Sequence, residues 1–264
     1  MRPRRYPTDL TDAQWAVLDP LLPDPAWAAG LGGRPEKHCR RRVVDAILYV
    51  LDNGIKWRAL PADFPPWQTV YSLFRRWEQA DASERILDTL RDRVRLKTGR
   101  EAAPSAAVID SSSVKGAPTV GGPTRGYDAG KKVSGRKRHI AVDTMGLLIC
   151  VLVTAANVQD RDGARPLLEL LADASARLKL VWADGGYAGK LIDWARQATG
   201  LVVSVVKRTE QHKFVVLPRR WVVERTLAWI ARHRRCAKDY ETLPACHEAW
   251  VRWSQIRLLL RRLE

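Results

Sequence analysis

The feature of this sequence that most limits its possible folds is the alternation of short apolar runs with amphipathic segments from residue 106 onward. Strand-like runs cover 106–114, two pieces of 139–157 separated by the turn Met145-Gly146, then 179–184 and 201–206. Segments with helical spacing of apolar residues cover 164–178, 189–199 and 219–235. The pattern predicts the order β-β-β-α-β-α-β-α.

This order separates two kinds of α/β fold. A doubly wound sheet alternates strands and helices from its beginning, whereas here three strands come first and the two pieces of 139–157 form a predicted hairpin. We therefore expect a mixed α/β domain over residues 104–264 with a ribonuclease H-like sheet, in which the first two strand pairs are antiparallel.

Residues 1–103 predict helices instead. Thr11 and Gln14 form a capping box at the start of the first helix, with Leu10 and Trp15 as a hydrophobic staple. Further helices are predicted over 40–54, where Gly54 is a stop signal, over 67–80 and over 82–99. The composition changes at 101–107, which we take as the boundary between the two regions.

The helices predicted at 40–54 and 67–80 resemble a helix-turn-helix. The second would bury Val70, Phe74 and Trp77 while Arg75 and Arg76 project elsewhere, toward a DNA groove. Helix pairs with exposed arginines also occur in proteins that never bind DNA, so both interpretations stay open.

Acidic residues follow two of the apolar runs. Asp110 ends AVID and Asp184 ends LVWAD, and ligands gather at such strand ends in α/β sheets. Two neighbouring carboxylates repel unless cations neutralise them. Glu224 is the only acid between Arg219 and Lys238, so it is a candidate third ligand. Three carboxylates suit Mg²⁺ or Mn²⁺, and two such ions serve phosphodiester chemistry. A turn-forming or ion-pairing role is the alternative for each acid taken singly.

Four segments carry a family resemblance: IDSSSVKG, RGYDAGKKVSGRKRHIAVDT, WADGGYAG and RRWVVERTLAWIARHRRCAKDYE. They resemble DDE transposases of the insertion sequence five family, and the similarity extends over the whole chain. The resemblance implies that Asp110, Asp184 and Glu224 are catalytic and hold two Mg²⁺ or Mn²⁺ ions. It also implies a helical DNA-binding region over 1–103 and a catalytic domain over 104–264.

Related transposases surround the glutamate with Tyr, two residues, Arg, three residues, Glu, six residues, then Lys or Arg. Arg220 and Glu224 keep this spacing, whereas Leu217 and Ala231 stand at the outer positions. We expect Arg220 to orient the carboxylate or hold a phosphate, with surface ion pairing as the alternative.

The charge of the chain favours a polyanionic partner. Of 45 Lys and Arg against 29 Asp and Glu, the back region holds 27 basic against 15 acidic residues. We expect the loop over 131–139 to contact DNA phosphates, with a merely solvated basic loop as the alternative, and Arg225 and Arg232 to grip a strand beside Glu224. The loop residues concerned are Lys131, Lys132, Arg136, Lys137 and Arg138.

The resemblance therefore implies a metal-dependent transposase that binds the terminal inverted repeats of its element, cleaves there and joins 3′-hydroxyl ends to target DNA. A dimer or larger assembly on double-stranded DNA is implied by the family. No membrane span or signal peptide is evident and the four cysteines are scattered, so we expect a protein of the bacterial cytoplasm and nucleoid. A DNA-binding repressor derived from a transposase and a structure-selective nuclease remain as alternatives.

Overall fold

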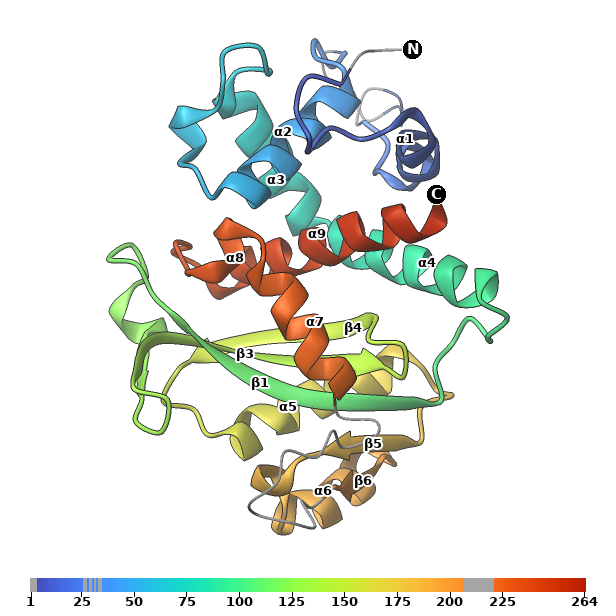
Figure 1. Ribbon diagram of the computed structural model, residues 1–264, viewed down its shortest axis with the longest axis vertical. Coiled ribbons are helices and arrows are strands. Elements are labelled where there is room, and N and C mark those ends of the chain that lie inside the picture. Colours follow the sequence, from blue (N-terminus) through green and yellow to red (C-terminus); the bar gives the residue numbers. More distant parts are fainter. Residues whose placement is uncertain (1–3, 26–27, 29, 31, 33–34, 207–220) are drawn as a thin grey trace.

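One mixed β-sheet forms the centre of the region that follows residue 103 (Figure 1). The computed structural model describes residues 4–25, 28, 30, 32, 35–206 and 221–264. Six strands of this described part form the sheet: β1 Ala106–Lys115, β2 Gly126–Asp128, β3 Val133–Asp143, β4 Leu148–Ala155, β5 Leu180–Ala183 and β6 Val202–Val205.

The strand pairing agrees with the sequence pattern. β3 pairs antiparallel with both β1 and β4, while β5 runs parallel to β1 and to β6. The order across the sheet is thus β4-β3-β1-β5-β6, with the short β2 on the same edge of β3 as β4. The predicted hairpin is confirmed: Gly146 occupies the left-handed region at φ 77°, and the Asp143 carboxylate accepts the N–H groups of Met145 and Leu147.

Helices cover both faces of this sheet. α5 (Asp160–Ala174) and α6 (Lys190–Thr199) pack on one face, and α7 (Trp221–Ala231) crosses the other over β1 and β3 (Figure 1). Alternate residues along each strand serve the two sides. Val108 and Trp182 join the core on the α7 side, whereas Ile109 and Val181 join the core on the α5 side.

The N-terminal region consists of helices α1 Asp12–Leu18, α2 Arg40–Asn53, α3 Trp67–Gln79 and α4 Ala82–Lys97. The local signals behave as predicted. Thr11 and Gln14 form the capping box at the start of α1, and Gly54 ends α2 in the left-handed conformation at φ 66°. The apolar positions of α3, among them Val70, Phe74 and Trp77, are buried.

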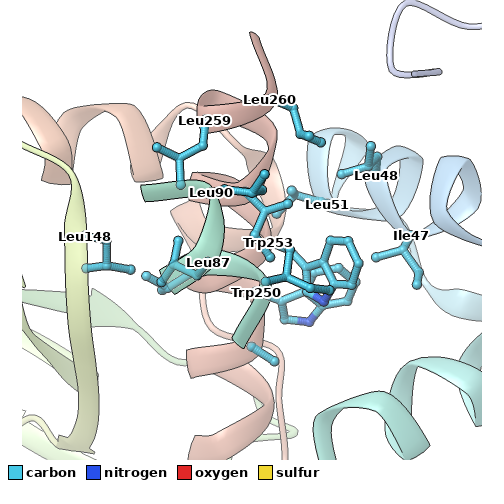
Figure 2. Packing of buried hydrophobic residues seen from close by; sticks show 14 of the residues in the cluster. Ile47, Leu48, Leu51, Leu87, Leu90, Leu148, Trp250, Trp253, Leu259 and Leu260 are labelled. Atoms are coloured by element: carbon cyan, nitrogen blue, oxygen red, sulfur yellow. The ribbon is translucent and has the colours of Figure 1, made fainter. Parts of the chain in front are cut away.

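Helix α9 (Pro244–Leu263) joins the two regions, and the sequence analysis had assigned no element to it. Its Trp250 and Trp253 are fully buried. Figure 2 shows these rings between Ile47 of α2 and Leu87 of α4, with Leu148 of β4 beyond Leu87. The hydrophobic core therefore continues across residue 103.

The predicted loop over 131–139 is wrong beyond Lys132. β3 begins at Val133, and its residues 135–143 pair with β1 while residues 136–142 pair with β4. The basic side chains of this segment hid the strand pattern, because Arg136, Lys137 and Arg138 were interpreted as loop cations open to DNA or solvent, although they are buried.

Two further expectations concern the chain as a whole. All four cysteines are unpaired. None of the helices in the described ranges is both long and apolar enough to cross a membrane.

Candidate active site

Asp110 lies within β1 and not at its end, which corrects the expectation from the sequence. The strand continues to Lys115 because Ser111, Ser112 and Ser113 pair with His139, Arg138 and Lys137 of β3. Serines are tolerated in this strand since β3 supplies backbone partners along its whole length. The carboxylate therefore projects from the surface of the sheet.

Asp184 directly follows β5, as predicted, and lies beside Asp110. The parallel register pairs Val108 with Trp182, and each aspartate comes two residues later on its own strand. Because side chains alternate along strands, Asp110 shares the face of Val108, the face covered by α7. The two carboxylates thus leave adjacent strands at the same level.

Backbone amides orient both aspartates. The N–H of Ser111 donates to Asp110 Oδ1 at 2.7 Å, and the N–H of Gly186 donates to Asp184 Oδ1 at 2.8 Å. Each bond is made by a residue one or two positions after the acid in sequence, so the carboxylate orientation is set locally. Gly185 and Gly186 form a single 3₁₀ turn with Tyr187 directly after Asp184.

The pKa of the buried Tyr187 responds to the carboxylates of this site. Burial raises the pKa of its hydroxyl well above the ordinary value, and the negative charges of Asp110, Asp160 and Asp184 act in the same direction. All three carboxylates therefore lie near one buried phenol. The sequence analysis did not single out Tyr187, although an aromatic residue directly after the Gly-Gly turn of WADGGY was an available signal.

Glu224 lies on the exposed side of α7, which packs on β1 and β3. The neighbouring Arg225 donates to the carbonyl of Met145 at 2.7 Å, and Thr226 donates to that of Gly146 at 2.7 Å. This side of α7 therefore faces the β3–β4 turn. Helical spacing turns Glu224 away from that contact, and its side chain is exposed.

The structure brings Asp110 and Asp184 together but does not complete the triad. Within the described ranges, no three His, Cys, Asp or Glu side chains are spaced to hold one metal ion together. The chemistry of the donors nevertheless fits a hard divalent cation, because all three candidates are carboxylates and two leave neighbouring strands.

Comparison with known proteins identifies the family. A profile described as "Transposase DDE domain" matches residues 101–257, which is more than half of the chain. This chain belongs to the DDE transposase family. A second profile, described as "Putative transposase of IS4/5 family", matches residues 10–87 and agrees with the resemblance noted from the motifs.

Two proteins of Burkholderia cepacia are similar to this transposase. One is named as a putative transposase for insertion sequence element IS402 and is 30% identical over 125 residues, or 45% of this chain and 59% of that protein. The other, an uncharacterized 16.2 kDa protein of insertion element IS402, is 30% identical over 114 residues, or 40% of this chain and 72% of that protein. The match thus spans about three fifths of the first relative.

Three of the cations predicted to contact DNA in this transposase are buried instead. Arg136 is fully buried and pairs with Asp239 at 3.0 Å. Lys137 pairs with Asp160 at 2.9 Å, and Arg138 donates to the carbonyl of Cys236 at 3.0 Å. The expected phosphate contacts of Arg136, Lys137 and Arg138 are therefore corrected: these groups are already bonded inside the protein, out of reach of a phosphate.

The other predicted cations are more accessible. Lys131 and Lys132 are exposed beside β3, and Arg76 on α3 and Arg232 after α7 are exposed as well. Arg75 is half-buried and its guanidinium contacts Cys246 Sγ at 2.7 Å.

Two arginines that flank Glu224 in sequence, Arg225 and Arg220, were also predicted to contact DNA. Arg225 is half-buried between the rings of Trp221 and Trp229, 4.2 and 4.5 Å from their centroids. Arg220 lies outside the described residues.

Proposed function

We propose that this chain binds the terminal inverted repeats of an insertion sequence, hydrolyses a phosphodiester at each element end and joins the 3′-hydroxyl ends to target DNA. The observation that carries the proposal is the pair Asp110 and Asp184 on adjacent parallel strands, under the helix that bears Glu224. The strand order and the two helical layers support a ribonuclease H-like assignment of this region.

The three carboxylates are the groups that would hold two Mg²⁺ or Mn²⁺ ions. Such ions, when bound, activate the attacking oxygen and stabilise the leaving one. The chain itself fixes the acids: β1 and β5 set the spacing of Asp110 and Asp184, and the amides of Ser111 and Gly186 orient them. No covalent intermediate with the protein is part of this proposal.

Cations around the acids would hold the DNA. Lys131 and Lys132 flank the start of β3 on the exposed surface, and Arg225 and Arg232 continue along α7 from Glu224. Arg220 belongs to the same proposal by its sequence position. Each cation that neutralises a phosphate adds to affinity and to its salt dependence.

The N-terminal helices would read the element ends. The solvent side of α3 carries Gln68, Tyr71 and Arg76, polar side chains that can reach base edges or phosphates, while Arg75 lies beside α9. α2 and α3 are joined by residues 54–66, a longer connection than the short turn of most helix-turn-helix motifs. Since two ends must be joined, we propose a dimer or larger assembly on DNA, acting in the bacterial cytoplasm at the nucleoid.

Strand transfer with a labelled element end tests the proposal. The native chain, Glu224→Gln and the matched control Glu169→Gln, an exposed acid of α5, are compared in Mg²⁺ and in Mn²⁺. We expect joined product from the native chain and the control, and none from Glu224→Gln although it still binds the end.

Other outcomes have distinct meanings. Joining by Glu224→Gln would show that Glu224 is not a ligand. Binding by the native chain without cleavage in either metal would favour a DNA-binding repressor, and cleavage without joining would favour a structure-selective nuclease.

A further inference from the structure

A cavity of about 410 Å³ lies where the C-terminal end of α7 meets α2 and α9, between the two regions of the chain. It is outside the site of the three acids. The side chains that matter for its chemistry are Asp52, Trp229, Arg232, His233, Arg257 and Arg261.

Positive charge exceeds negative charge in this cavity. Among the described residues that line it, Asp52 is the only carboxylate, against three arginines and one histidine. Asp52 Oδ1 already accepts hydrogen bonds from Arg257 at 2.7 Å and from His233 at 3.0 Å. Among the described residues, neither Arg232 nor Arg261 forms an ion pair, and both are exposed. Two guanidinium groups are therefore available to an anion.

The excess positive charge of the cavity also affects the pKa of Arg257, a buried residue of its wall. Burial lowers the pKa of Arg257, and the positive charge of Arg261 acts in the same direction although Asp52 opposes it. An anion between Arg232 and Arg261 would relieve this repulsion. Guanidinium forks match the geometry of phosphate oxygens.

The distance along α7 connects the cavity to the acids. Arg232 follows Glu224 by eight residues, which corresponds to about 12 Å along a helix axis. Successive nucleotides of one DNA strand advance by about 3.4 Å along the duplex. The cavity is thus separated from Glu224 by about three to four nucleotides of a strand that follows the helix.

We propose that this cavity binds one phosphodiester group of the element-end DNA, about three to four nucleotides from the cleaved bond, and so sets the register of the strand on the acids. The identity of the ligand as DNA rests on the proposed function. The chemistry shared by all sources of the ligand is a phosphate group held by Arg232 and Arg261, with Arg257 fixed behind them by Asp52.

Methylphosphonate scanning of the element end tests this inference by binding alone, without cleavage. Single neutral linkages are placed along the strand, and affinity is measured for the native chain, Arg261→Gln and the exposed control Arg93→Gln of α4. We expect one linkage, three to four nucleotides from the cleaved bond, to weaken the native chain and the control by about tenfold. Arg261→Gln should bind that modified DNA and unmodified DNA equally. Equal sensitivity of all three proteins, or no sensitive linkage, would overturn the inference.

A second arm separates backbone phosphate from free phosphate. The melting temperature is measured in inorganic phosphate and in chloride of equal ionic strength, for the native chain and for Arg261→Gln. Stabilisation of the native chain alone, together with the sensitive linkage, supports the inference. Stabilisation without any sensitive linkage would show a site for free phosphate and overturn the DNA assignment. If the native chain shows the sensitive linkage but joins no DNA, the result would count against the proposed function and would still support the phosphate site in the cavity.

Discussion

The basic residues of β3 and those around α7 both occur in arginine-rich segments, but they differ in their surroundings. Those of β3 are buried and bonded within the protein, whereas Arg232 and Arg261 near α7 are exposed. Arg136 and Arg138 lie in the interior, where Asp239 and backbone carbonyls bind their guanidinium groups. Arg232 and Arg261 lie on the surface without a carboxylate partner in the described part of the chain. The count of 45 Lys and Arg therefore overstates the number of cations that DNA can meet, since some of them fasten the C-terminal segment to the sheet.

The largest expected effect is on the buried pair. Asp239→Asn leaves the guanidinium of Arg136 fully buried without its carboxylate, so we expect the free energy of unfolding to fall by about 3–5 kcal/mol. Urea denaturation measures this loss. Asp173→Asn, an exposed acid of α5, is the control and should change stability by less than about 0.5 kcal/mol. Equal effects of the two variants would show that the buried pair does not fasten the structure.

A second prediction concerns pH and the same strand. Burial lowers the pKa of His139 to about 4, from an ordinary value of 6.5, so the folded protein holds this imidazole neutral. Between these values the unfolded chain binds more protons, and the stability from this group is complete above pH 6.5 and lost as pH falls toward 4. The loss amounts to about 3 kcal/mol.

Unfolding free energies measured from pH 7 to pH 4 test this prediction. His139→Gln keeps a polar side chain that can bond to Thr154 but has no titrating group, so its stability should depend less on pH over this interval. Parallel pH profiles of the native chain and the variant would contradict a neutral, buried His139.

Most features that depend on residues close together in the sequence were predicted, whereas several features that depend on residues far apart in the sequence were not. Local signals were sufficient for α1, with its capping box, for the end of α2 at Gly54, and for the β3–β4 turn, where Asp143 bonds its own turn. Each depends on residues within a few positions of one another. The pairing of Asp110 with Asp184 was expected from apolar runs, and the parallel register agrees with it.

The errors involve partners far away along the chain. Arg136 was interpreted as solvated because its partner Asp239 is remote in sequence and no periodicity shows it. The continuation of β1 past Asp110 likewise depends on β3, since three serines give no strand signal by themselves. α9 did have a local signal, Pro244 at its first turn followed by helical spacing of apolar residues, and was missed all the same.

Arg225 is intermediate between the two kinds of cation. Its guanidinium stacks between Trp221 and Trp229 and donates to the Met145 carbonyl, yet it remains half-exposed. Arg225→Gln removes both interactions, and we expect the free energy of unfolding to fall by about 1 kcal/mol. Arg232→Gln, with no such contacts, should be neutral. If urea denaturation finds no difference between the two variants, the stacking contributes nothing to stability. Arg225 would then count as an exposed cation, and only the buried cations would stabilise the fold.

Two lysines of one motif, Lys132 and Lys137, allow a direct comparison of a surface cation with a buried one. The smallest effect on stability is expected at Lys132. Lys132 is exposed, whereas Lys137 is buried and pairs with Asp160 at 2.9 Å. Lys132→Gln should leave the free energy of unfolding within about 0.5 kcal/mol of the native value and lower the salt dependence of DNA binding by about one phosphate contact. Lys137→Gln should do the reverse, because it breaks a bond inside the protein and removes no surface charge from the DNA. Binding isotherms at several salt concentrations, combined with urea denaturation, measure both quantities. A salt dependence lowered by Lys137→Gln would mean that the buried lysine reaches DNA after all, and the division between fastening and DNA-binding cations would have to be withdrawn for β3.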